Sequence, residues 1–270
     1  MLRLSALYRF PLKSGKGESQ PQARLDKLGL VGDRRWMLVD EASGRFLTQR
    51  TEPKMSQLSA LWNGAGGLTL SAQGFSPLEV ALPDPDDNLR GVTIWRDTLR
   101  VPDAGDEAAQ WLSGFIDKPV RLVHVPLERA RMTESGYGQD DDKVAFADGY
   151  PLLLIGQASL DDLSQKVGRS LEMLRFRPNL VIEGSEAFAE DVWKRVRIGD
   201  VEFRVVKPCS RCILTTIDPQ TGERDANREP FATLNHYRKQ EGGAMFGQNL
   251  VNDGEGVLEV GMPVTILEYR

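Results

Sequence analysis

The sequence predicts a β-rich α+β protein built from two successive domains. The first hundred residues are mostly short stretches in which apolar and polar side chains alternate, the pattern of half-buried strands. Turn-forming residues such as Glu41–Gly44 and Asn63–Gly67 separate these stretches and indicate hairpins. The alternating pattern restarts after Pro119. We therefore expect an antiparallel β domain over residues 1–118 and a second domain over residues 119–270.

Composition and charge exclude several classes of protein. A chain of 270 residues with 40% hydrophobic and 27% charged residues is typical of a globular protein. No apolar run approaches the ~18 residues of a membrane span, and the N-terminus lacks an apolar signal core. The net charge of −5, without a long basic run, argues against a nucleic-acid partner. We expect a cytoplasmic protein with no membrane partner.

The predicted elements of the first domain are strands and one helix. A helix is expected over 107–115, because Trp111, Leu112 and Phe115 fall on one face, with Asp106 as its N-cap. The strands are expected at residues 2–9, 35–40, 45–50, 58–62, 68–72, 78–81, 92–95 and 99–101.

The second domain is expected to begin with a strand over 120–125. Residues 134–143 are polar and predict a mobile loop, whose aspartates Asp140–Asp142 lack the order of a calcium-binding loop and are expected to be solvated. A buried strand over 151–155 precedes a helix capped by Ser159 and ending near residue 167. A further strand is expected over 180–183.

Both cysteines of the chain, Cys209 and Cys212, lie three positions apart. Residues 201–206 before them alternate as a strand, and residues 213–217 after them are rich in β-branched side chains and predict another. The two thiols are therefore expected in a loop between strands. Neighbouring Lys207 would favour a thiolate there.

Several kinds of site remain open for this pair of thiols. A redox pair of the thioredoxin type opens a helix, whereas a strand is expected here. A structural zinc site needs two further ligands, which His124 and His236 would have to supply without finger-like spacing. Two inert buried cysteines are a third possibility. The fourth is that one cysteine ligates a cofactor.

Two basic segments are candidates for binding an anion. The loop Pro11–Gly17 lacks the spacing of a nucleotide-binding P-loop and could simply be a solvated turn. Arg175 and Arg177 lie two positions apart in a segment expected to be extended, which would point both guanidinium groups the same way. Surface ion pairs are the alternative for these arginines.

Blocks of sequence along nearly the whole chain resemble one protein family. The blocks are FPLKSGKG from Phe10, GDRRWMLVD from Gly32, FADGYPLLL from Phe146, RFRPNLVIEG from Arg175, KPCSRCILTTIDP from Lys207 and GMPVTIL from Gly261. In this order they resemble the MOSC-domain proteins, in particular the bacterial YcbX-like proteins and the mitochondrial amidoxime-reducing component. The resemblance implies an N-terminal MOSC-associated β domain and a β-barrel-like MOSC domain.

The resemblance also implies a molybdenum-pterin cofactor (Mo-molybdopterin) and the residues that hold it. Cys212 matches the cysteine that ligates the metal. Asp148 matches a residue of the loop over the site, as either a proton donor or a structural acceptor. The other matching cofactor-binding residues are Lys13, Ser14, Arg34, Gly149, Tyr150, Arg177, Asn179, Ser210 and Arg211.

The implied activity is the two-electron reduction of small N-hydroxylated compounds, such as hydroxylamines, amidoximes and N-hydroxylated bases. An iron–sulfur cluster needs about four thiolates, and no GxGxxG stretch predicts a nicotinamide or flavin site. A separate electron-transfer protein, a ferredoxin- or flavodoxin-like reductase, is therefore expected. The alternative function is a cofactor or sulfur carrier with a persulfide on Cys212 or Cys209, and a binding module without chemistry is the third.

Overall fold

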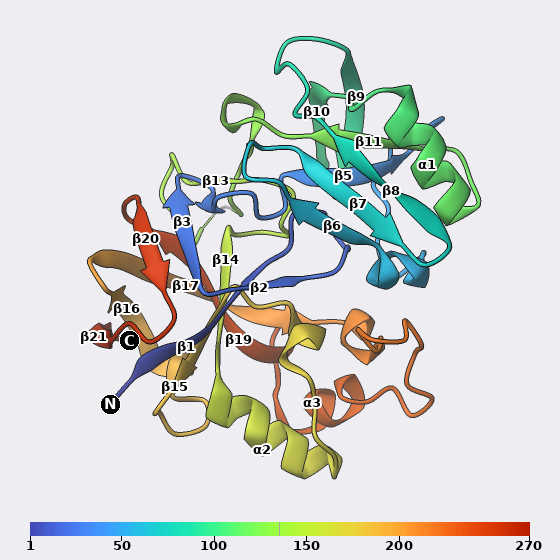
Figure 1. Cartoon of the computed structure of the whole chain (residues 1–270). Helices are drawn as coiled ribbons and strands as arrows, with labels where there is room; N and C mark the ends of the chain where they lie inside the picture. Colours follow the sequence, from blue (N-terminus) through green and yellow to red (C-terminus); the bar gives the residue numbers. More distant parts are fainter. Residues whose placement is uncertain (135) are drawn as a thin grey trace.

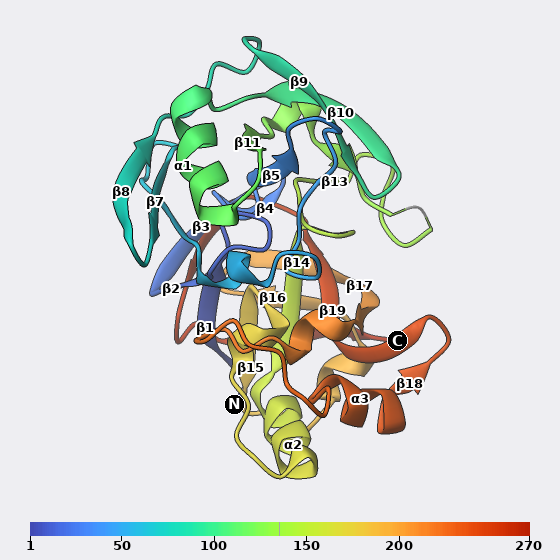
Figure 2. The same ribbon diagram turned by 90° about the vertical axis from the view of Figure 1, so that its right-hand side faces the viewer.

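The protein has two lobes, as a computed structural model covering residues 1–134 and 136–270 shows (Figures 1 and 2). The upper lobe contains helix α1 (Asp106–Ile116) and several small sheets, and the lower lobe contains one large sheet with helices α2 (Gln157–Val167) and α3 (Phe231–Tyr237). The predicted β-rich α+β class is confirmed. Ser135, within the predicted loop 134–143, lies outside the described residues.

The strands of the large sheet come from both ends of the chain, so the sheet brings several of the sequence blocks quoted above together. In spatial order it runs β2 (Glu18–Gln20), β1 (Arg3–Arg9), β15 (Leu180–Glu183), β14 (Leu152–Gly156), β19 (Gly243–Asn252), β17 (Val201–Arg211), β16 (Trp193–Ile198) and β21 (Val264–Tyr269), with β18 (Lys239–Gln240) beside β19. Strands β14 and β15 run parallel, so a crossover must connect them, and α2 supplies it.

Both faces of the large sheet are covered. One face buries a cluster that includes Leu7, Leu154 and Phe203, and the opposite face packs Ile155 and Phe246 against residues of α2 and α3. Central strands covered on both faces are expected to be almost continuously apolar. Strand β14, with the sequence LLLIG and every residue buried, fits this expectation.

The upper lobe is assembled from small antiparallel sheets around α1. Leu112 of α1 packs with Trp36 and Leu122 in one buried cluster. Its sheets are β5 (Trp36–Asp40) with β11 (Val120–His124), β9 (Leu89–Ile94) with β10 (Asp97–Pro102), and β6 (Ser59–Trp62) with β7 (Leu68–Ala72) and β8 (Phe75–Val80). Two further small sheets are β12 (Arg131–Met132) with β13 (Lys143–Val144), and β20 (Gly256–Glu259) with β3 (Gln22–Asp26) and β4 (Gly29–Leu30). The second of these packs against the large sheet, because Leu25, Leu30 and Leu258 belong to the buried cluster of that sheet.

Hydrogen bonds connect the two halves of the sequence. Strand β1 pairs with β15 from the second half, and β11, which follows the expected boundary, pairs with β5 from the first half. The division into residues 1–118 and 119–270 stays a prediction.

The expectation of a strand over residues 45–50 is wrong. Arg45 and Phe46 make only isolated bridges among the described residues. The backbone then turns, because the Thr48 carbonyl accepts hydrogen bonds from the amides of Thr51 and Glu52 at 3.1 and 2.8 Å. This turn carries Arg50.

The expectation that both thiols lie in a loop between two strands is also wrong. Strand β17 continues through Cys209 to Arg211, because Ser210 and Arg211 still pair with β19. The expected strand at 213–217 is instead a 3₁₀ turn, Ile213–Thr216. Hydroxyl groups explain this turn: Thr215 donates to the Cys212 carbonyl at 3.0 Å and Thr216 to the Ile213 carbonyl at 2.7 Å. Such local bonds compete with sheet pairing.

Both predicted helix caps need correction. Asp106 is the first residue of α1 and pairs with Arg121 at 2.7 Å, while Gly105 precedes the helix. Ser159 lies inside α2, and its hydroxyl donates to the buried Glu190 carboxylate at 2.8 Å. Each side chain therefore makes a tertiary contact instead of a local one.

The acidic run Asp140–Asp142 is not uniformly solvated. Asp142 is buried, and its two oxygens accept hydrogen bonds from Arg204 of β17 at 2.7 and 2.8 Å. Burial alone would raise the pKa of Asp142, but the hydrogen bonds and charge of Arg204 outweigh it and hold that pKa below its usual range. This pair fastens Asp142 to the large sheet.

We predict that Asp142→Asn lowers the free energy of unfolding by about 3 kcal/mol at neutral pH. This value is at the low end of the range for removing one partner of a buried ion pair, because Arg204 keeps its hydrogen bond to Asp253. The folded-state pKa is lowered, so the stabilisation is complete above the ordinary aspartate pKa and is lost as pH falls through the folded value. Urea titrations at several pH values should show the two proteins converging in acid. Asp141→Asn, at an exposed neighbour, should change little, and an equal loss there would contradict the assignment.

None of the helices described for residues 1–134 and 136–270 is long and apolar enough to cross a membrane.

Candidate cofactor site

A cavity of about 400 Å³ is lined by side chains from both lobes. This size is within the usual range for small-molecule sites. All eleven predicted site residues line it: Lys13, Ser14, Arg34, Asp148, Gly149, Tyr150, Arg177, Asn179, Ser210, Arg211 and Cys212. The structure therefore brings together residues that are spread over about 200 positions of the sequence.

Each thiol has a guanidinium group beside it. Arg50 donates from Nε and Nη2 to the Cys212 sulfur, both at 3.4 Å. Arg211 donates from Nη1 to the Cys209 sulfur at 3.0 Å. Cys212 directly follows β17 and precedes the 3₁₀ turn, so its backbone is held from both sides. Sulfur is a ligand that soft metals prefer.

A lysine–aspartate pair lies in the same cavity. Lys13 is buried and donates from Nζ to Asp148 Oδ1 at 2.6 Å and to the Phe146 carbonyl at 2.7 Å. Burial lowers the pKa of Lys13, and Asp148 only partly offsets this.

Asp148 is ionised at neutral pH. Its side chain is 64% exposed, and that exposed surface faces the cavity that it lines. Burial among protein atoms would raise the pKa of Asp148, but Lys13, Arg50 and Arg34 hold it well below its usual range. The carboxylate therefore accepts hydrogen bonds there.

Arg34 and Asn179 form a bonded framework behind the cavity. Arg34 donates to Asp33 at 2.6 Å, to the Asn179 side-chain oxygen at 3.1 Å and to the Arg177 carbonyl at 2.8 Å. The Asn179 amide donates to the Tyr8 carbonyl at 3.2 Å, and its oxygen accepts from the Leu153 amide. Both side chains thus hold neighbouring backbone in place.

Arg177 is placed differently from the sequence expectation. It follows the 3₁₀ turn Met173–Phe176 in a left-handed conformation, so Arg175 and Arg177 are not parallel residues of an extended segment. Arg175 pairs with Asp218, whereas Arg177 donates to the Gly15 carbonyl at 2.6 Å. Burial, reinforced by nearby Arg34, lowers the pKa of Arg177. A guanidinium group still stays charged at neutral pH.

Three of the predicted site residues adopt left-handed backbone conformations that favour glycine. The φ angles are +64° at Ser14, +47° at Arg34 and +56° at Arg177. Such residues cost of order 1–3 kcal/mol each and cluster at functional sites. Three of them around one cavity indicate that the backbone there is fixed for binding.

The residues fit an anionic, metal-containing cofactor. Within the described residues, Nη2 of Arg177 and Nε of Arg211 are buried without a hydrogen-bond partner, and such donors are costly unless a ligand satisfies them. Their positive charge, together with Lys13, suits phosphate and other anionic oxygens. Cys212 adds a soft ligand at the same cavity.

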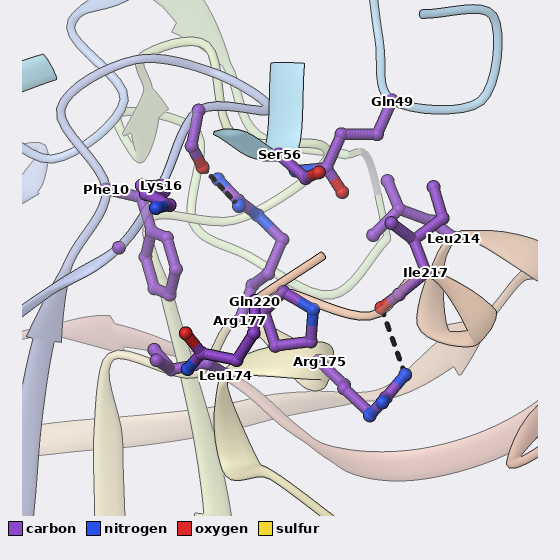
Figure 3. A pocket seen from close by; sticks show the side chains of 13 residues that line it. Phe10, Lys16, Gln49, Ser56, Leu174, Arg175, Arg177, Leu214, Ile217 and Gln220 are labelled. Atoms are coloured by element: carbon purple, nitrogen blue, oxygen red, sulfur yellow. Dashed lines mark hydrogen bonds between the residues drawn. The ribbon is translucent and has the colours of Figure 1, made fainter. Parts of the chain in front are cut away.

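A second cavity of about 190 Å³ shares Arg177 and Leu214 with the first. Figure 3 shows it, with Phe10 and Leu214 among its walls and Arg175 hydrogen-bonded to the Ile217 carbonyl at 3.1 Å. Arg177 thus lines both cavities.

Two of the other interpretations of the cysteine pair, the structural zinc site and the thioredoxin-type redox pair, find no support in this geometry. Among residues 1–134 and 136–270 no group of three or more histidine, cysteine or acidic residues is placed to hold a metal. His124 instead packs against Trp36, with 4.9 Å between ring centroids. Cys209 lies within a strand, and no α-helix begins at the pair as the thioredoxin arrangement requires.

Sequence reasoning missed part of the cavity wall. Arg50 was assigned to a strand, and its contact with Cys212 depends on the turn at Thr48. Trp95 and Asn249 also line the cavity, and no motif distinguishes them. The long strand β19 and helix α3 were likewise not expected.

The fold and this cavity define a MOSC-domain protein. A family model described as the MOSC N-terminal beta barrel domain matches residues 1–119, and one described as the MOSC domain matches residues 141–265. Within this class the chain belongs to the family of the mitochondrial amidoxime-reducing components.

Curated relatives match along almost the whole chain. Mitochondrial amidoxime-reducing component 1 of Danio rerio is 35% identical over 96% of this chain and 83% of its own length. The Homo sapiens component 1 is 34% identical over 98% of this chain and 82% of its own. Component 2 of Rattus norvegicus is 34% identical, with 97% and 82% covered. The predicted resemblance is confirmed.

Proposed function

We propose that this protein is a molybdenum-pterin-dependent reductase of small N-hydroxylated compounds. The observation that carries the proposal is the convergence of Cys212 and three basic side chains, Lys13, Arg177 and Arg211, on one cavity. Two buried nitrogens of these arginines, Nη2 of Arg177 and Nε of Arg211, have no hydrogen-bond partner among the described residues. The names of the relatives, amidoxime-reducing components, support the substrate class. The reaction is R–NH–OH plus two electrons and two protons, giving R–NH2 and water.

Distinct residues would hold the metal and the pterin phosphate. Cys212 would ligate molybdenum, and Arg50 would hold its sulfur in position through the two N–H contacts. Lys13, Arg177 and Arg211 would bind anionic oxygens, with the unpartnered nitrogens of the two arginines as donors. When bound, the molybdenum centre supplies the two-electron chemistry that removes oxygen.

Framework residues would keep these groups in position. Arg34 and Asn179 hold the backbone at Arg177 and Leu153, and the Ser14 carbonyl accepts from Gln49 at 2.8 Å. Tyr150 donates to the Glu134 carbonyl at 3.1 Å. Gly149 and Ser210 would add backbone and hydroxyl contacts at the cavity wall.

Asp148 would act as an acceptor. Its low pKa keeps it ionised at neutral pH, and a group with a pKa far below the working pH is a poor general acid. Its contact with Lys13 instead fixes the ammonium group that would face the cofactor.

The test is metal and pterin analysis of purified protein combined with turnover. We expect stoichiometric molybdenum and reduction of benzamidoxime with a reduced viologen as artificial donor. NADH or NADPH alone should give no turnover, because electrons would come from a separate ferredoxin- or flavodoxin-like reductase. Robust NADH-driven turnover by pure protein would contradict the electron route. Sulfane sulfur on Cys212 or Cys209 without molybdenum would replace the proposal with a sulfur carrier.

A further inference from the structure

Trp95 occupies an unusual place in the upper lobe. It begins the two-residue turn between β9 and β10, where Ile94 pairs with Asp97. Its φ angle is +55°, in a region that bulky residues rarely adopt. Two-residue hairpins favour glycine or asparagine at such positions. A large aromatic residue therefore occupies a position at which glycine would have an unstrained backbone.

The side chain of Trp95 is partly exposed, and it lies at the wall of the cavity. It is 40% exposed and lines the same cavity as Cys212. Its ring packs against Phe46, with centroids 4.9 Å apart. Strain combined with exposure at a cavity indicates a role in binding rather than in stability.

Arg50 connects Trp95 to the cysteine sulfur. The Arg50 guanidinium carbon lies 4.9 Å from the centre of the Trp95 ring, and the same guanidinium donates to Cys212 at 3.4 Å. The indole is therefore one side chain away from the proposed metal ligand. A flat molecule lying on the part of the indole that Arg50 and Phe46 leave exposed would share one cavity with the sulfur.

We propose that Trp95 is a specificity-determining residue, a platform on which planar, conjugated N-hydroxylated substrates stack with the N–OH group directed toward Cys212. This inference rests on the proposed function. Stacking on an aromatic ring is worth ~1–3 kcal/mol for a nucleobase-sized group, whereas a small aliphatic hydroxylamine has no flat face to stack. Arg50 holds the indole by its cation–π contact.

The test compares one planar and one aliphatic substrate on cofactor-loaded protein. For Trp95→Ala, kcat/KM for benzamidoxime should fall about ten-fold, equivalent to ~1.4 kcal/mol, while N-methylhydroxylamine should stay within about two-fold. Titration of benzamidoxime into the oxidised protein without electron donor should show a matching rise in Kd. Trp95→Phe, which keeps an aromatic face, should restore most of the preference.

Two further variants separate binding from folding. Trp95→Gly should lose the preference while its melting temperature stays the same or rises, because glycine relaxes the left-handed turn. Tyr269→Ala removes a 61% exposed aromatic residue of β21, outside the cavity, and should change neither substrate. The proposed role of Trp95 would be overturned if Trp95→Ala lost kcat/KM equally for both substrates or for neither. A large drop in the melting temperature of Trp95→Gly would overturn it as well. Failure of the wild-type protein to reduce either compound would overturn the proposed function instead.

Discussion

Cys212→Ala is expected to abolish reduction of N-hydroxylated substrates and to leave the protein folded. The substitution removes the sulfur that Arg50 contacts and that would ligate molybdenum, so the proposed protein ligand of the metal would be lost. Cys212 is only partly buried, and truncation there leaves no large core cavity. Turnover with an artificial donor, metal content and circular dichroism measured on the same preparation would separate loss of chemistry from loss of fold.

Cys209→Ala is the matched control. Cys209 also lines the cavity and also contacts an arginine, but it lies within β17 rather than after it. This variant should keep most of the activity and bind molybdenum. Equal loss in both variants would count against a single ligand and would favour a site made of both sulfurs.

Arg177→Ala is expected to lower cofactor occupancy at least about ten-fold after dialysis at limiting cofactor. The guanidinium offers an unpartnered buried nitrogen, and a hydrogen bond to a charged group is worth ~1.5–3 kcal/mol. Molybdenum and pterin content, measured without any turnover assay, would report the loss. Arg169→Ala, at a half-exposed arginine paired with Asp225, should retain wild-type occupancy.

Arg177→Gly distinguishes ligand binding from backbone effects. At a φ of +56°, glycine is unstrained, whereas alanine carries a cost of ~1–2 kcal/mol. The glycine variant should therefore be the more stable of the two and should lose cofactor just as completely. Retention of molybdenum in either variant would remove Arg177 from the cofactor site.

The family resemblance located the candidate site because the residues that it assigns lie in short motifs of this sequence. The KS, GDR, RxRPN and CSRC segments each contribute residues to one cavity, and a motif survives errors in the local structure assigned to it. Arg177 illustrates this: the segment around it is a 3₁₀ turn and a left-handed residue rather than a strand, yet the residue reaches the cavity.

The elements that were missed depend on interactions that no local pattern reveals. Residues 213–217 are β-branched, but the hydroxyls of Thr215 and Thr216 bind preceding carbonyls and close a turn. Serine is a common N-cap residue, but the hydroxyl of Ser159 donates a hydrogen bond to the buried Glu190 carboxylate instead of capping α2. Trp95 and Arg50 meet only because the hairpin β9–β10 and the turn after Thr48 face the same cavity.

The order in which the cavity wall is synthesised has a consequence for cofactor delivery. Lys13 emerges from the ribosome about 200 residues before Cys212, a delay of roughly 10–40 s at ~5–20 residues per second. Strand β1 finds its partner β15 only after residue 183 has been made, and β17 is held by β19, which ends at Asn252. A nascent chain therefore presents basic residues without the sulfur ligand for most of its synthesis. If the proposed cofactor binds in this cavity, its loading would follow synthesis of Cys212, and cells starved of it should accumulate protein that can be activated later.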